Sequence, residues 1–221
     1  AQKSCLALLY ELPSTKDIAE CNLTHLTHLL SDNSNKKFNR EKAIQIRELA
    51  RKSIGLNSNS VSLELKQTIS IIRFIQEQLD DVEKRIKEIL KEINSPILTI
   101  PGISFKTAGS ILAEIGDISR FDSPAKLLAF AGLDPSMYQS GKFFSTHSVM
   151  VKRGSKYLRF ALMTAARMVC LNDVTFNEFK NKKMAEGKHY MVTMGHVAKK
   201  LVRVIYYLLK TNNVYQANKV A

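Results

Sequence analysis

The sequence predicts an all-α fold: a helical connector and a coiled-coil arm, followed by a compact helical domain that contains a helix-hairpin-helix. Only 9 Gly and 5 Pro interrupt 221 residues, alternating apolar and polar runs are scarce, and many segments begin at a helix-capping residue. Hydrophobic residues make up 45% of the chain, which argues against disorder. We therefore expect no β-sheet of more than two or three strands. The connector, the arm and the compact domain are expected at residues 1–58, 59–95 and 96–221.

The connector alternates short apolar segments with polar loops. Helices are expected near residues 4–12, 16–21, 23–30 and 40–53. Gly55 is expected to end the last of them, and residues 57–60 form a short polar link to the arm.

The arm carries apolar residues at heptad spacing. One seam position holds Leu65, Ile72, Leu79, Ile86 and Ile93, and the other holds Thr68, Ile75, Val82 and Ile89. Four such heptads are typical of a coiled coil or a long helical hairpin. Ile69, Ile71, Phe74 and Leu90 lie off this seam, so a long core helix of a bundle is an equally good interpretation. Either way, we expect this helix to pair with another, in the same chain or in a second copy.

The segment 98–116 predicts two helices joined by a tight turn at Pro101-Gly102. Ser104 is expected to cap the second helix, and Gly116 fits the stop after its last turn. Ala108, Gly109 and Ala113 are small, so the second helix could lie close to the first. Backbone N–H groups at the turn and at the start of the second helix suit a phosphate oxygen. An ordinary helical corner is the alternative.

Further helices are expected after this hairpin. Ser123 caps a short helix that begins at Pro124 and ends before Gly132. Residues 133–153 have no helical period and predict an extended loop, with a brief β-ribbon at 142–151. The remaining helices are expected at residues 155–171, 174–184 and 189–209.

The charge of the chain is concentrated in its second part. The net charge is +13, and residues 96–221 hold 18 Lys and Arg against 7 Asp and Glu, a net of +11. Such a basic segment favours a polyanion as partner over a solubility surface or an anionic membrane, because solubility surfaces usually mix both signs. No apolar run is long enough to span a membrane, and the first residues lack the layout of a signal peptide. Cys5, Cys21 and Cys170 form neither a disulfide framework nor a zinc pattern, which predicts a reducing cytoplasm.

Residue types that bind metals or nucleotides do not cluster along the sequence. The carboxylates of the basic segment are isolated, the five histidines form no ligand set, and no Gly-rich nucleotide loop is present. We therefore expect no cofactor in this chain.

The loop after residue 133 is the candidate chemical site. Ser140-Gly141 is followed by Lys142, then by Lys152 and Arg153, and then by Lys156 and Arg159. A hydroxyl group near several cations can attack a phosphodiester, since the cations hold the phosphate and stabilise the charge that develops. On spacing alone this pattern is weak, because most loop serines cap helices or face solvent.

Four stretches in this order resemble the C-terminal domain of a family of bacterial and archaeal insertion-sequence transposases. They are residues 98–116, ISRFDSPAKLLAFAGLDP at 118–135, QSG at 139–141 and VKRGSKYLR at 151–159. The family combines a RuvC-like acidic domain with a C-terminal serine and is understood as bridge-RNA-guided recombinases. The resemblance implies that Ser140 forms a covalent phosphoserine link to a DNA end. It also implies a phosphate-binding role for basic residues near the serine, and cytoplasmic, nucleoid-associated action in a bacterium or archaeon. With the hairpin, the expected nucleic-acid contacts are Gly102, Ser104, Lys106, Thr107, Lys142, Lys152, Arg153, Lys156 and Arg159.

The resemblance covers residues 96–210 well and residues 1–95 more loosely. Family members begin with a RuvC-like domain whose four acidic residues bind magnesium, and no such segment precedes Ala1. We therefore expect a C-terminal fragment or a degenerate copy that binds DNA and guide RNA, assembles through its coiled coil, and exchanges few strands alone. A non-catalytic helix-hairpin-helix module that binds nucleic acid is the alternative. A structural coiled-coil protein is the third interpretation.

Overall fold

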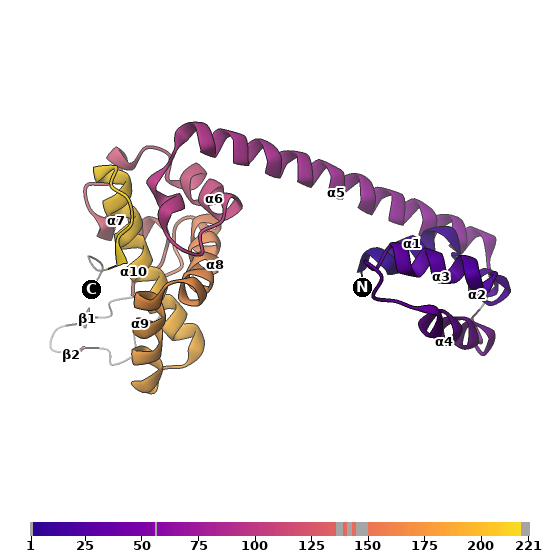
Figure 1. Cartoon of the computed structure of the whole chain (residues 1–221). Coiled ribbons are helices and arrows are strands. Elements are labelled where there is room, and N and C mark those ends of the chain that lie inside the picture. Colours follow the sequence, from indigo (N-terminus) through magenta and orange to yellow (C-terminus); the bar gives the residue numbers. More distant parts are fainter. Residues whose placement is uncertain (1, 56, 136–138, 141–142, 145–149, 218–221) are drawn as a thin grey trace. The chain divides into compact units, whose positions relative to one another are not determined.

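The computed structural model describes residues 2–55, 57–135, 139–140, 143–144 and 150–217 (Figure 1). In these ranges the regular structure consists of ten α-helices, two short 3-10 helices and two strands of two residues each. The predicted all-α class is confirmed, and no sheet in the described residues exceeds two strands. The chain divides into two compact units, Ala1–Asp81 and Val82–Ala221, and the boundary falls inside helix α5 (Asn59–Ile93).

The first unit is a cluster of short helices and the first part of α5. Its other helices are α1 (Gln2–Glu11), α2 (Thr15–Glu20), α3 (Leu23–Asp32) and α4 (Arg40–Arg51). Side chains that accept a hydrogen bond from the first helical turn cap three of them, at Ser14, Asn22 and Asn39. The core between these helices contains Leu8, Ile18, Leu26, Leu30 and Ala43.

Helix α5 buries different residues from those of the heptad seam. Ile69 is 1% exposed in the first unit and Leu90 is 3% exposed in the second, and both lie off the seam. Leu79 and Val82, in contrast, occupy seam positions and are 53% and 55% exposed. Within each described unit, therefore, the buried residues of α5 are not those of the seam.

The second unit is built around α8 (Lys156–Asn172) and α10 (Tyr190–Thr211), which pack against each other. Helix α7 (Pro124–Phe130) packs on α10, and α6 (Phe105–Ile115) packs on α8, while α9 (Val174–Ala185) contacts both central helices. The largest fully buried side chains of this core include Ile97, Ile111, Leu127, Leu133, Leu158, Leu162 and Phe176. The remaining elements are the 3-10 helices η1 (Pro96–Thr99) and η2 (Ile118–Arg120) and the strands β1 (Gln139–Ser140) and β2 (Phe143–Phe144).

The two helix caps predicted at Ser104 and Ser123 are confirmed, and a third serine caps α8. The side chains of Ser104, Ser123 and Ser155 each accept a backbone hydrogen bond at the start of α6, α7 and α8. Pro124 occupies the first turn of α7, and Gly116 follows α6 with a φ of +60°.

The turn before α6 differs from the predicted hairpin. The element that precedes it is η1, a single 3-10 turn of four residues, because α5 ends at Ile93. Gly102 has a φ of +93°, and a Cβ there would lie 2.6 Å from the backbone oxygen of Met168 in α8. Only glycine allows this approach, so the turn is held against α8. Ala108 is buried as expected, but Ala113 is exposed, so it does not bring two helices together.

No helix in the described ranges combines the length and the apolar character that a membrane crossing requires.

Candidate nucleic-acid interface

A groove of about 940 Å³ lies in the second unit between α8, α10 and the two ends of the loop 135–150. Its described lining consists of Pro135, Met150, Lys152, Lys156, Arg159, Phe160, Met163, Arg167, Met191, Val192, Gly195, His196 and Lys199. We call this the cationic groove, because five of these side chains are Lys or Arg.

Each helix contributes one face to the groove. The α8 residues follow the sequence 156, 159, 160, 163 and 167, and the α10 residues follow 191, 192, 195, 196 and 199. This spacing places each set along one side of its helix. The apolar part of the lining comes from residues such as Met163 and Met150, and the Lys and Arg side chains supply its charge.

The five cations of the groove are Lys152, Lys156, Arg159, Arg167 and Lys199. Within the described residues, none of them lies within 4.0 Å of a carboxylate. Burial lowers the pKa of the Lys199 ammonium, which shows that its charge is only partly solvated. A surface with several Lys and Arg side chains and an apolar part attracts a polyanion.

His196 lies on the same face of α10. Burial, followed by the charges of Lys199 and Lys188, lowers the pKa of its imidazole. The free groove therefore holds His196 mostly neutral at pH 7.

The loop that carries Ser140 leaves and returns at the groove. Pro135 and Met150, which both line the groove, form an antiparallel β-bridge. Next to this bridge along the chain, the Val151 N–H donates to Asp134 O over 3.0 Å. The Lys152 N–H donates to Gly132 O over 3.1 Å, so backbone hydrogen bonds hold the base of the loop together.

Arg159 adds a side-chain clamp to this base. Its Nη1 donates to the carbonyl oxygens of Ala131 at 3.2 Å and Lys152 at 3.1 Å. A Cβ at Gly132 would lie 2.2 Å from Arg153 O and 2.6 Å from this same Nη1. Gly132, with a φ of +64°, therefore leaves room for the clamp.

The expected ribbon is present at an earlier position. In β1 and β2, Gln139 pairs with Phe144 and Ser140 pairs with Phe143, whereas residues 142–151 were expected to form it. Lys142 and the side chain of Ser140 lie outside the described part of the chain.

The hairpin residues do not line the groove. The Ser104 hydroxyl accepts from the Thr107 N–H, Lys106 forms an ion pair with Glu83 of α5, and Gly102 faces α8. Arg153 is exposed but is not part of the lining. Of the predicted contacts that the structure describes, Lys152, Lys156 and Arg159 meet in one place.

Sequence analysis missed Arg167, His196 and Lys199 as members of this set. Arg167 follows Lys156, Arg159 and Met163 at helical spacing, so the sequence alone could have placed Arg167 on the same face of this helix. The α10 residues carry no such signal, because only packing brings the two helices together.

Residues 94–182 match the transposase IS116/IS110/IS902 family. This segment is therefore similar to the transposase domain of that family. It runs from the end of α5 into α9 and includes the loop of Ser140 and the α8 wall of the cationic groove, but not α10.

Curated relatives are similar over a longer segment. The chain is 26% identical over 164 residues to an insertion element IS110 uncharacterized 43.6 kDa protein of Streptomyces coelicolor, covering 72% of this chain and 40% of the relative. It is 30% identical over 151 residues to the pilin gene-inverting protein of Moraxella bovis, covering 65% and 47%. It is 29% identical over 151 residues to a transposase for insertion sequence element IS1328 of Yersinia enterocolitica, covering 64% and 44%. The chain thus spans less than half of the length of these relatives.

Residues that could hold a metal ion do not gather in the part of the chain that the structure describes. No group of three or more His, Cys, Asp or Glu side chains is close enough there to bind one.

Proposed function

We propose that this chain is the nucleic-acid-binding and strand-exchange part of a transposase or recombinase, with Ser140 as nucleophile. The observation that supports it is the position of the Ser140 loop, which opens from a groove lined by five Lys and Arg side chains. The match of this same segment to a transposase family supports DNA as the substrate. The pilin gene-inverting relatives, by their name, invert a DNA segment, which is also a recombination reaction.

The cationic groove would bind the phosphate backbone. Each phosphate that a Lys or Arg neutralises releases condensed counterions, so binding weakens as salt rises. Such contacts position a strand but do not specify its sequence. In this proposal DNA and the guide RNA of the resembled family are both candidates for the groove, since both present the same phosphates.

The proposed chemical step is a transesterification. The Ser140 oxygen forms a bond to phosphorus while the bond from phosphorus to one deoxyribose oxygen breaks. The serine proton passes to the departing sugar oxygen, so the phosphodiester is exchanged without net hydrolysis. Cations of the groove such as Lys156 and Arg167 stabilise the negative charge that increases on the phosphoryl oxygens.

The exposed seam of α5 supports self-association as part of this function. Leu79 and Val82 occupy seam positions, and coiled coils bury such positions between two helices. Pairing through α5 would bring two transposase domains to one DNA complex.

Placing a cysteine at the nucleophile position tests the proposal. We expect a Ser140→Cys variant to form a disulfide with duplex DNA that carries thiol tethers on its phosphates. The wild-type chain, whose Cys5 is exposed, measures the background. If no cross-link forms above that background, the placement of residue 140 at the DNA backbone is refuted.

The chemistry is tested with Ser140→Ala and radiolabelled ends of the insertion element. We expect this variant to bind the DNA with unchanged affinity but to form no covalent adduct on a denaturing gel. An adduct that survives Ser140→Ala would assign the nucleophile to another residue.

A further inference from the structure

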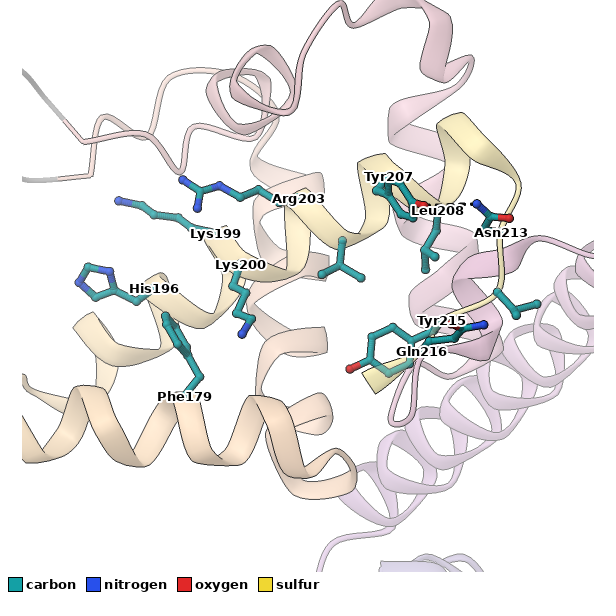
Figure 2. Close-up of a pocket in the computed structure, with 12 residues that line it drawn as sticks. Phe179, His196, Lys199, Lys200, Arg203, Tyr207, Leu208, Asn213, Tyr215 and Gln216 are labelled. Carbon is teal, nitrogen blue, oxygen red and sulfur yellow. Dashed lines mark hydrogen bonds between the residues drawn. The ribbon is translucent and has the colours of Figure 1, made fainter. Parts of the chain in front are cut away.

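A second cavity, of about 600 Å³, lies on the other side of His196 and Lys199 in the same unit. It is bounded by α9, by α10 and by the segment that follows α10, as Figure 2 shows. Its volume lies within the range of about 300–1,000 Å³ that is usual for small-molecule sites. We call it the aromatic cavity, because Phe179, Tyr207 and Tyr215 line it.

The wall formed by Tyr215 is held in place by two hydrogen bonds. Its backbone N–H donates to Thr99 Oγ1 over 2.8 Å, and its hydroxyl donates to Asp173 Oδ2 over 2.9 Å. Asp173 is buried and also accepts from the Phe176 N–H, at the start of α9. Burial and the hydrogen bond to Asp173 raise the pKa of the Tyr215 phenol, so it stays protonated and keeps donating. The ring is therefore fixed before any ligand arrives.

Cations surround this aromatic space. Lys199, Lys200 and Arg203 line it, and none of them lies within 4.0 Å of a carboxylate among the described residues. Lys200 Nζ lies 5.0 Å from the centre of the Phe179 ring. In Figure 2, Lys200 and Tyr215 lie on the same side of α10.

These groups match the parts of one nucleotide. Aromatic faces stack on a base, cations bind its phosphate, and the exposed amides of Asn213 and Gln216 can bond to base edges. A base inside a duplex has its faces covered by its neighbours, so only an unpaired base can use such a cavity. His196 and Lys199 line both this cavity and the cationic groove, so one strand can reach both.

We propose that the aromatic cavity binds one unpaired nucleotide of a DNA or RNA strand whose backbone lies in the cationic groove. The base stacks on Tyr207 and Tyr215, and its phosphate lies beside Lys200 and Arg203. This inference rests on the proposed function of the groove, and it adds recognition of an unpaired base next to it.

Tyr207 is the residue to change. Its side chain is 53% exposed, and its hydroxyl accepts a single hydrogen bond, from Asn213 Nδ2 at 3.4 Å. Tyr207→Ala therefore removes a stacking surface without opening the core, and Tyr207→Phe is the matched control that keeps the ring. The probes are fluorescent oligothymidine, oligouridine, a blunt duplex and an abasic strand, all of one length, with binding followed by anisotropy.

We expect Tyr207→Ala to weaken binding of the base-bearing single strands about tenfold, while Tyr207→Phe has little effect. Binding of the duplex and of the abasic strand, which lacks bases but keeps its phosphates, should not change. Loss on oligothymidine alone or on oligouridine alone would support the site and identify which of the two strands it binds. An equal loss on all four probes, or no loss on any, would overturn the proposal.

Two further measurements separate this proposal from the groove and from a free-ligand site. If Arg167→Gln leaves duplex binding unchanged, the proposed function of the groove fails, whatever Tyr207→Ala does. If free thymidine monophosphate binds as tightly as oligothymidine, the cavity serves a small molecule and the strand proposal is overturned.

Discussion

Arg159 donates to the carbonyl oxygen of Lys152 over 3.1 Å, across the base of the loop that carries Ser140. The sequence predicted Arg159 as a phosphate contact, but its guanidinium already holds two backbone oxygens, those of Lys152 and Ala131. Both hydrogen bonds come from Nη1, whose position the rigid planar guanidinium fixes, whereas the ammonium of a lysine lies at the end of a flexible stem.

We therefore expect Arg159→Lys to destabilise the fold by about 1–2 kcal/mol, although the charge is retained. The midpoint of urea unfolding measures this change. An unchanged midpoint with weaker DNA binding would mean that Arg159 acts only as a phosphate contact.

Among the described residues, the Arg167 guanidinium donates to the Met191 sulfur at 4.0 Å and to no backbone oxygen, so its change should act on binding. Arg167→Gln should weaken duplex DNA binding and reduce the slope of log K against log salt by about 1. Lys91→Gln, an exposed residue of α5 outside the groove, removes the same charge and is the control. Equal effects of both variants would show that only net charge matters.

Self-association through α5 predicts a dimer by sedimentation equilibrium. Leu79→Lys should raise the dissociation constant by at least about 100-fold, because the dimer contains two copies of Leu79 and each buried Leu contributes roughly 1.5–3 kcal/mol. Ile71→Lys is the matched control, since Ile71 is also exposed on α5 but lies off the seam. A monomeric wild-type chain would refute this assembly.

His196 should make DNA binding depend on pH. Its pKa is lowered in the free protein, and a phosphate beside it would raise that pKa, so binding takes up a proton. We expect the affinity for duplex DNA to rise as pH falls from about 7.5 to 5.5, and His196→Gln to abolish the rise. A pH profile that is the same for wild type and variant would contradict this.

The free energy of unfolding of the DNA-free protein should decrease as the pH falls, whereas its affinity for DNA increases. Because the folded pKa of His196 lies below its ordinary value of 6.5, the unfolded chain binds the proton first. The neutral imidazole therefore favours folding above pH 6.5, and this contribution is lost as pH falls toward the folded pKa. Thermal melts of wild type and His196→Gln over this range would show the difference.

The sequence by itself determined most of the helices and several of their caps. Ser104 and Ser123 were predicted as caps because each bonds to a backbone N–H three residues away, a contact that needs no tertiary structure. Ser155, expected as the first residue of a helix, caps α8 in the same way. The basic stretch from Lys152 to Arg159 was predictable because its residues are close neighbours in the sequence. The family resemblance that indicated Ser140 as the nucleophile rests on this stretch and on residues 98–116, 118–135 and 139–141, which precede it in the sequence.

Tertiary structure decided which of these residues meet. Lys199 reaches the groove only because α10 packs on α8. Gly102, predicted as a phosphate contact, packs against the backbone of α8. Ile69 and Leu90 became the buried residues of α5, although the heptad pattern favoured their neighbours. The physical reason is that the rotation of a helix about its axis follows from the surfaces it packs against. An amphipathic pattern only narrows that choice to a wide stripe.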